Sequence, residues 1–460
     1  MSEPVYRVWR LLSTLVVGLP IGTNLDVCTL LWLVCSGGLL DSRGAIIPGL
    51  SALGLDVAAV QRTWAALGHG AWTSAQLLGW WATIVRDEGR WQPHTYAGYH
   101  PVAVDVTGFW RPRLRDCPTG HYHAVAGKAL PAIPVGIIAR VGSVDGQRFG
   151  VPLAFVRANP DDPRPSVHQQ RLVAEAVAQC AADDVPVFDA GFRLGPLQAA
   201  GVGAYVVRVP ANFTARRAQP PAYRGRGRPP TRGALVRPLA RRRGARLLAA
   251  TPPDQVTTWH EGDTIVRAER WHDLVLPATT ATTATATTAT TATTATATTT
   301  AATAPGRPTF SVVAIHDPRY TQPLLLATPL AISSPAVRGL YRDRWPVEQA
   351  PLVTKQLLGA ARQFVHAPET VQRLPELTLL AGAVLTYAAA TSPAVPTGSW
   401  DRVPQRTPGR LRRVLRHTVF PSVSGLPARL RKKAAATAHL PKGFFGQRHP
   451  RAARPLEQVA

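Results

Sequence analysis

The stretch YRDRWPVEQAPLVTK, residues 341–355, carries charged side chains at helical spacing. Arg344 and Glu348 are about one helical turn apart and Lys355 lies about two turns further on, so on an unbroken helix all three share one face. Pro351 interrupts such a helix, because proline lacks a backbone N–H and clashes with the preceding turn. The sequence therefore predicts a kink or a late helix start, and this irregularity determines where Lys355 points.

Short apolar runs of strand character precede this stretch. HPVAVDVTGFW, AIPVGIIARVG and RFGVPLAFVRA are β-rich and bounded by Gly and Pro. An amphipathic helix, SVHQQRLVAEAVAQCAADD, follows with Ser166 as its expected N-cap, and then come the strands VPVFDAGF and GAYVVRVPA. TFSVVAIHDP and PLLLATPL add two strands before a helical region from Ser334 to about Ala390. This order predicts an α/β sheet covered by helices.

Three acidic residues stand at positions where a charge is costly. Asp105 lies within the strand VAVDVT, Asp189 ends the strand VPVFDAG, and Glu348 belongs to the helical region. Taken singly, each has an ordinary explanation, since Asp before Gly forms turns and Glu near a helix start favours the helix dipole. Taken together, two Asp from strands and one Glu from a helical region offer the oxygen ligands that Mg²⁺ prefers, so the three residues are candidate metal ligands.

The pattern Y-x2-R-x3-E-x6-K, formed by Tyr341, Arg344, Glu348 and Lys355, resembles the signature of bacterial insertion-sequence transposases of the DDE type. Such a match arises by chance about once in a hundred thousand windows. VAVDVTGF, LLLATPL, and DAGF followed by GVGAYVVRVPAN also resemble segments of that group; the last contains Arg208 and Asn212. The resemblance covers roughly residues 100–213 and 306–390.

The resemblance implies a ribonuclease H-like core that cleaves and joins DNA at transposon ends. Its catalytic and metal-binding triad would be Asp105, Asp189 and Glu348, with Mg²⁺ as cofactor and Mn²⁺ as a possible substitute. The partners that it implies are terminal inverted repeats and target DNA, bound by a homodimer. The DNA-binding residues that it implies are Tyr341, Arg344, Lys355 and Arg208.

We therefore expect an α/β fold in which a ribonuclease H-like mixed sheet is flanked by helices, with an inserted β-rich and partly disordered region and an N-terminal helical domain. The expected divisions are 1–95, a helical DNA-binding domain; 96–213, the first part of the core; 214–305, a basic insertion with an Ala/Thr linker; 306–395, the second part of the core; and 396–460, a basic tail.

The N-terminal region contains apolar segments but no clear membrane span. Between Leu11 and Leu40 the apolar residues are interrupted by Pro20, Asn24 and Asp26, which predicts two buried helices. The start lacks the features of a secretory signal, so we expect a cytoplasmic, nucleoid-associated bacterial protein without a membrane partner. The tryptophans of this region favour core packing over base stacking; they are Trp64, Trp72, Trp80, Trp81 and Trp91.

The charge balance favours a polyanionic partner. Lys and Arg number 52 against 27 Asp and Glu, a formal net charge of +25, which attracts nucleic acid. The Arg-rich segment from Thr214 to Leu247 is equally compatible with DNA contact and with a solvated loop. The segment Ala278 to Ala304 consists of Ala and Thr alone and predicts a poorly ordered linker. His121 and His123 lack a third ligand at suitable spacing and predict a surface loop.

Two other functions fit part of this pattern. A DNA-binding descendant of a transposase without catalysis is suggested by the Ala/Thr tract and the Arg-rich insertion, whereas the three acidic residues argue against it. A simple Mg²⁺ nuclease would cut DNA but not join it, and a strand-transfer assay separates it from a transposase.

Overall fold

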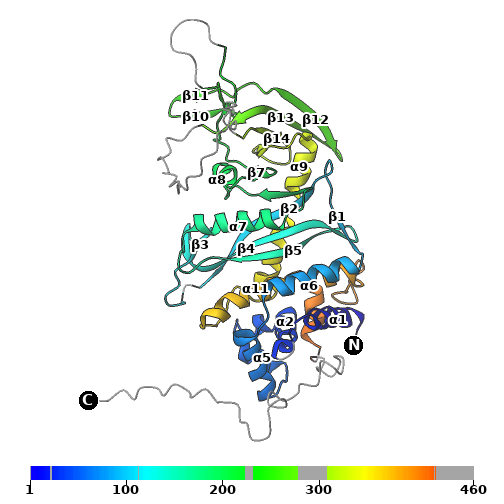
Figure 1. The fold of residues 1–460 in the computed structure, drawn as a ribbon. Coiled ribbons are helices and arrows are strands. Elements are labelled where there is room, and N and C mark those ends of the chain that lie inside the picture. Colours follow the sequence, from blue (N-terminus) through cyan, green and yellow to red (C-terminus); the bar gives the residue numbers. More distant parts are fainter. Residues whose placement is uncertain are drawn as a thin grey trace, which may run out of the picture.

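The computed structural model describes residues 2–20, 23–111, 113–222, 232–277, 308–418 and 420. Within these residues the chain is a mixed α/β protein in which a large sheet is flanked by helices (Figure 1). The helices α6 (Ser74–Asp87) and α11 (Pro368–Thr391) lie on one side of the strands β4 (Lys128–Val144) and β5 (Gln147–Arg157), and α7 (Pro165–Gln179) lies on the other. The predicted α/β class, with a mixed sheet between helices, is confirmed.

The sheet runs in the order β1-β4-β2-β6-β7-β15-β14-β13-β8-β9, with β12 on β13 and with β3 and β5 on β4. The pairs β2–β6 and β6–β7 are parallel and the other pairs are antiparallel. Besides β4 and β5, the strands of the chain are β1 Trp91–Pro93, β2 His100–Trp110, β3 Gly120–His123, β6 Asp184–Phe188, β7 Val206–Arg208, β8 Ala215–Arg217, β9 Leu235–Val236, β10 Arg241–Arg243, β11 Arg246–Leu248, β12 Gln255–Glu261, β13 Thr264–Val275, β14 Phe310–His316 and β15 Leu324–Thr328.

The remaining helices gather mainly at the two ends of the chain. They are α1 Glu3–Val17, the 3₁₀ turn η1 Thr23–Asp26, α2 Val27–Cys35, α3 Gly38–Asp41, α4 Ile46–Ala52, α5 Val57–His69, α8 Leu194–Ala199, α9 Ser334–Arg342, α10 Pro346–Leu352, the π-helical turn η2 Val353–Leu357, and α12 Pro408–Arg416.

Most local predictions are confirmed, and four are wrong. The helical region expected from Ser334 to about Ala390 is interrupted at residues 358–367, which lie between η2 and α11 and are not helical. The N-cap of α7 is Arg164 rather than Ser166, because Pro165 takes the first helical position with its fixed φ. His121 and His123 lie in β3 rather than in a loop, because that strand pairs with β4. The segment expected to be helical up to residue 95 ends earlier, since β1 begins at Trp91 and pairs with β4.

The N-terminal helices do not form a core of their own. The side chains of α1, α2 and α6 share one hydrophobic cluster with α11 and with one face of β4 and β5. The expected burial of α1 and α2 is confirmed, and so is core packing for Trp72 and Trp81, whereas Trp80 is exposed. Among the described helices, α11 alone is long and apolar enough to cross a membrane, but its side chains are almost all buried, as in the core helix of a soluble protein.

The insertion between β7 and β14 is β-rich in its described part, as expected, because it contributes β8 to β13. The Ala278–Ala304 tract, the middle of the Arg-rich segment and the tail beyond residue 420 lie outside the described residues.

Candidate active site

The first two acidic residues are brought together by strand register. In the parallel pair β2–β6, Val104 lies opposite Phe188. Asp105 directly follows Val104 and Asp189 directly follows Phe188, so the two acids occupy matching positions on neighbouring strands. Asp105 stays within β2, where the Val106 N–H donates to its Oδ1 atom at 2.8 Å, while Asp189 follows the end of β6. The predicted approach of these two carboxylates is a direct result of this pairing.

Glu348 is brought to Asp105 by an arginine of the same signature. The helix α9 ends at Arg342 and α10 begins at Pro346, so Glu348 lies in the first turn of α10. Its carboxylate pairs with Nη2 of Arg344, whose Nη1 atom lies 3.8 Å from Oδ2 of Asp105. The Arg344 side chain is only 9% exposed, so a buried guanidinium lies between the first and third acids.

Asp189 is contacted by two more of the residues expected to bind DNA, Tyr341 and Arg208. The Tyr341 hydroxyl donates to Asp189 Oδ1 at 3.0 Å, and Arg208 Nη1 lies 3.8 Å from the same oxygen. Burial raises the pKa of the Tyr341 phenol to about 12, and the nearby charge of Asp189 adds to this rise. The phenol therefore stays protonated at neutral pH and can keep donating.

The three carboxylates influence one another. Burial raises the pKa of Asp105 to about 6; the Arg344 charge and the Val106 N–H oppose the rise, and the charges of Glu348 and Asp189 add to it. Burial acts to lower the pKa of Arg344, but the negative charge of Asp189, together with the charge of Glu348 and its hydrogen bond to Arg344, outweighs burial and raises the pKa. The site therefore concentrates negative charge around one buried cation.

Lys355 follows the helix irregularity that Pro351 predicted. Pro351 is inside α10, and the chain then passes into the π-helical turn η2, which carries Lys355. Its Nζ atom donates to Thr107 Oγ1 at 2.6 Å and lies 4.7 Å from the centre of the Trp110 ring. Burial lowers the Lys355 pKa to about 8, and the charge of Asp105 opposes this shift. Lys355 is thus a second, partly buried cation beside β2.

The donor set fits a hard divalent cation, although no cage for one is formed by the side chains as they stand. Among the residues that the structure describes, no group of three His, Cys, Asp or Glu side chains is arranged to hold a metal ion. Arg344 instead neutralises two of the three acids. Asp105, Asp189 and Glu348 nevertheless offer carboxylate oxygens, which are the ligands that Mg²⁺ and Mn²⁺ prefer. Their combined negative charge also favours a bound cation.

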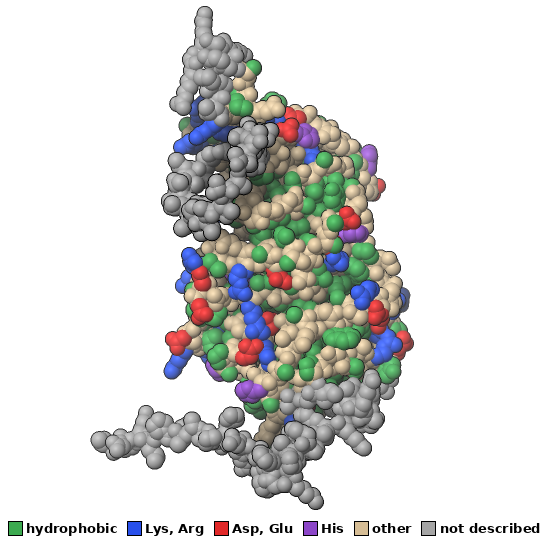
Figure 2. All heavy atoms as spheres, in the orientation of Figure 1, with side chains coloured by type: hydrophobic (Ala, Val, Ile, Leu, Met, Phe, Trp, Pro, Cys, Tyr) green, Lys and Arg blue, Asp and Glu red, His purple; other side chains and the backbone are tan. Residues whose placement is uncertain are grey.

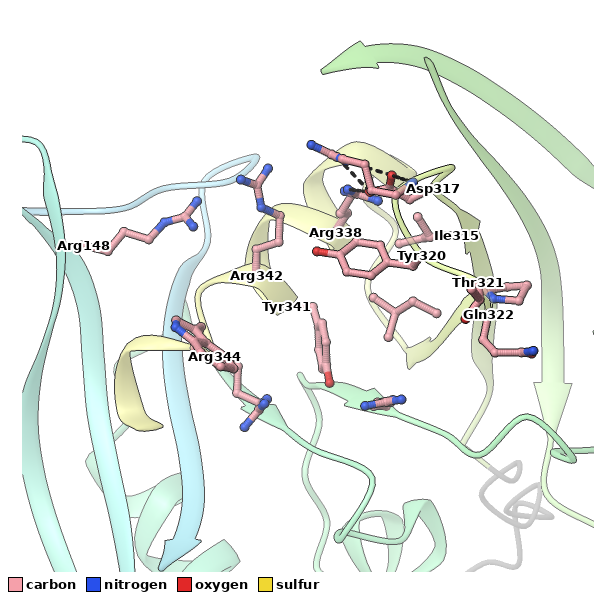
Figure 3. A pocket seen from close by; sticks show the side chains of 15 residues that line it. Arg148, Ile315, Asp317, Tyr320, Thr321, Gln322, Arg338, Tyr341, Arg342 and Arg344 are labelled. Atoms are coloured by element: carbon pink, nitrogen blue, oxygen red, sulfur yellow. Dashed lines mark hydrogen bonds and ion pairs between the residues drawn. The ribbon is translucent and has the colours of Figure 1, made fainter. Parts of the chain in front are cut away.

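A pocket of about 640 Å³ opens beside these acids (Figure 3). Tyr341 and Arg344 lie on its α9 side, and Arg148 reaches toward it from β5. The exposed rings of Tyr320 and Trp345 also line it. Its charged lining residues are Arg148, Arg208, Arg319, Arg338, Arg342, Arg344 and Asp317.

The arginines of this pocket are paired with acids of the chain. Arg319 contacts Glu261 and Asp317 at 2.9 and 2.8 Å, and Arg338 contacts the same two carboxylates. On the face of the molecule in Figure 2, basic and acidic side chains are likewise interspersed over the sheet. The arginines distant from the signature were not predicted, because no spacing in the sequence connects β5 or the β14–β15 turn to residues 341–355.

Of the predicted site residues, the structure brings Asp105, Asp189, Arg208, Tyr341, Arg344 and Glu348 into one cluster, and Lys355 borders it beside Thr107. A comparison with models of protein families gave no match, and a comparison with curated proteins gave none either.

Proposed function

We propose that this chain is a DDE-type DNA transposase with a ribonuclease H-like core. One observation carries the proposal. Asp105 and Asp189 occupy matching positions on neighbouring parallel strands, and Glu348 is connected to Asp105 through Arg344. This is the combination of two strand carboxylates and one helix carboxylate that metal-dependent phosphoryl transfer requires.

Asp105, Asp189 and Glu348 would hold Mg²⁺, with Mn²⁺ as a substitute. A bound ion of this kind supplies Lewis acidity that activates the attacking hydroxyl and stabilises the leaving oxygen. Arg344 and Arg208 lie against these acids. With a divalent cation bound by the carboxylates, Arg344 and Arg208 would be available to DNA phosphates, with which arginine forms strong charge-assisted hydrogen bonds.

The remaining partners follow from charge and from the resemblance of the signature. The formal charge of +25 favours DNA over an uncharged partner. We propose terminal inverted repeats and target DNA as substrates, recognition by the N-terminal helices, and a homodimer on paired ends in the bacterial nucleoid. The arginine-lined pocket beside Tyr341 would accept the sugar-phosphate backbone of the cleaved end.

A DNA-binding protein without catalysis is a second candidate, because one observation favours it. Arg344 already pairs with Glu348 and lies close to Asp105, so the chain itself neutralises the proposed metal ligands. A simple nuclease would use the same carboxylates. Nicking without strand transfer supports the nuclease, and DNA binding without nicking supports the inactive descendant.

The test uses carboxylate-to-amide variants, which keep size and shape but remove charge. Asp105→Asn, Asp189→Asn and Glu348→Gln should each abolish Mg²⁺-dependent nicking of a labelled duplex that carries the DNA flanking the coding region. Binding of that duplex in a gel shift should survive, because the charge balance becomes more positive. A variant that nicks at the wild-type rate would remove that residue from the metal site, and three such variants would refute the proposal.

A further inference from the structure

We propose that Asp343, together with His94 and Tyr96, forms a positioning cluster that fixes the joint between α9 and α10 and thereby sets where Arg344 and Glu348 lie relative to Asp105. This inference rests on the proposed function, because it assigns a role to residues behind the same site.

The carboxylate of Asp343 is fully buried and surrounded by donors from other elements. His94 Nδ1 lies 2.6 Å from Oδ2, and the Tyr96 hydroxyl donates to the same oxygen at 2.9 Å. Arg148 Nε lies 3.2 Å from Oδ1, and the exposed fraction of the Asp343 side chain is 0%. A buried carboxylate is costly unless such partners compensate it, so these contacts determine where the joint can lie.

His94 and Tyr96 lie on the segment that leads into β2. Residues 94–99 connect β1 to β2, the strand that carries Asp105. This connection is held by backbone hydrogen bonds, from His94 N–H to Val141 O at 3.2 Å and between Tyr96 and Tyr99 in both directions. The cluster thus links the strand of the first acid to the joint that carries Arg344.

Tyr96 also packs directly on the backbone of α9. A Cβ atom at Gly339 would lie 2.3 Å from Cε1 of Tyr96, so the ring occupies space that only glycine leaves free. The Asp343 N–H donates to Gly339 O at 3.2 Å, so Tyr96 contacts both ends of the last turn of α9. Burial, with the Asp343 charge next, raises the Tyr96 pKa to about 12, so the phenol remains a donor at neutral pH.

The contacts of Asp343 are needed to fix the joint, because the residues on either side of it, Arg342 and Arg344, bind different acids. Arg342 contacts Glu261 at 3.4 Å, whereas Arg344 pairs with Glu348. The segment between α9 and α10 is a turn held by hydrogen bonds between residues three apart, from the Arg344 N–H to Tyr341 O at 3.0 Å and from the Trp345 N–H to Arg342 O at 3.4 Å, rather than by the four-apart bonds of an α-helix. A rotation of this turn would move Arg344 and Glu348 together away from Asp105.

The test removes single contacts while keeping the packing. Tyr96→Phe keeps the ring on Gly339 but deletes the hydroxyl, and His94→Leu deletes the second donor. The matched control is Tyr99→Phe in the same connection, because the Tyr99 hydroxyl makes no hydrogen bond within the described residues. His94→Asn should rescue, since its amide nitrogen can take the place of Nδ1.

Both deletion variants should slow Mg²⁺-dependent nicking by at least about ten-fold, as small displacements of catalytic groups do. They should also weaken Mg²⁺ binding in calorimetry, while the gel shift stays at the wild-type value. Because each variant leaves the buried Asp343 carboxylate with one donor fewer, the melting temperature should fall slightly, but the protein should remain fully folded at the assay temperature. Tyr99→Phe and His94→Asn should match the wild type in every measurement.

If the wild type nicks and Tyr96→Phe and His94→Leu match it in rate and in Mg²⁺ affinity, Asp343 is structural only and the inference is wrong. If the deletion variants lose activity only in proportion to a fall in melting temperature, the inference is equally wrong. If the wild type neither nicks nor binds Mg²⁺, the proposed function fails and the inference falls with it.

Discussion

At the scale of single residues, the side chain of Arg344 connects β2, α9 and α10 at the site. It pairs with Glu348, approaches Asp105 and lies over the ring of Tyr341, with its guanidinium carbon 5.8 Å from the ring centre. Lysine could not replace it, because one ammonium group lacks the planar fork that reaches two carboxylates. Arg344 therefore links two of the three acids, Asp105 and Glu348.

The pKa of Asp105 gives a stability prediction that requires no DNA. Its value in the folded protein is about 6 against an ordinary 3.8, so its contribution to stability is fully present below about pH 4 and is lost as the pH rises through about 6. Between about pH 4 and 7 the wild type should therefore lose about 2 kcal/mol relative to Asp105→Asn. Urea unfolding of both proteins across this range measures the difference, and a difference that does not change with pH would contradict the prediction.

At the element scale, the region from α9 to α11 is built from short helices that change type. The π-helical turn η2 follows Pro351, and its Thr354 hydroxyl donates to Thr378 O of α11 at 3.0 Å. This contact fixes η2 against the core helix. As a result Lys355 reaches Thr107 on β2 rather than continuing along a straight helix.

A glycine of α11 makes this packing possible. A Cβ atom at Gly382 would lie 2.5 Å from Thr354 Oγ1, so Gly382→Ala should destabilise the protein by about 1–3 kcal/mol despite the higher helix propensity of alanine. Gly79 of α6 is the matched control, because a Cβ atom there would meet nothing within 4 Å and Gly79→Ala should stabilise by up to about 1 kcal/mol. Denaturant unfolding measures both, and equal effects at the two positions would contradict the packing argument.

At the scale of the whole molecule, the two ends of the chain are tied into one core. Arg7 of α1 pairs with Glu88, which accepts a hydrogen bond from the Tyr387 hydroxyl of α11 at 2.7 Å. Arg90 donates to Thr391 O at 2.7 Å. The N-terminal helices therefore cover α11.

Truncation at the expected domain boundary should consequently fail. A fragment of residues 96–460 would expose the buried face of α11 and leave Tyr387 without Glu88. We expect this fragment to aggregate or to bind a hydrophobic dye without a cooperative melting transition. A soluble fragment with a sharp transition would instead establish residues 1–95 as a separate domain.

Deletion of the Ala278–Ala304 tract should be tolerated. The strands on either side of it are hydrogen-bonded neighbours, with Leu274 of β13 opposite Phe310 of β14. The deletion leaves residues 276–277 and 305–309 to join them, which is enough for a hairpin connection. The melting temperature and nicking should match the full chain, and a large fall in melting temperature would show that the tract stabilises the fold.

The sequence by itself determined the features that depend on near neighbours. Alternating apolar residues predicted β2, β4 and β5, and the resemblance of residues 341–355 to a transposase signature selected Tyr341, Arg344 and Glu348 as a group. Pro351 predicted an irregular helix, and the structure has a π-helical turn just after it. Such features are local because side-chain periodicity and backbone restrictions act over a few residues.

Only the tertiary structure decided the contacts between distant segments. Register in the β2–β6 pair brought Asp105 level with Asp189, and strand pairing made His121 part of β3. Asp343 gave no signal in the sequence, since its partners lie about 250 residues away and are selected by packing. The sharing of one core by both ends of the chain is equally hidden, because an apolar helix face specifies burial but not which surface buries it.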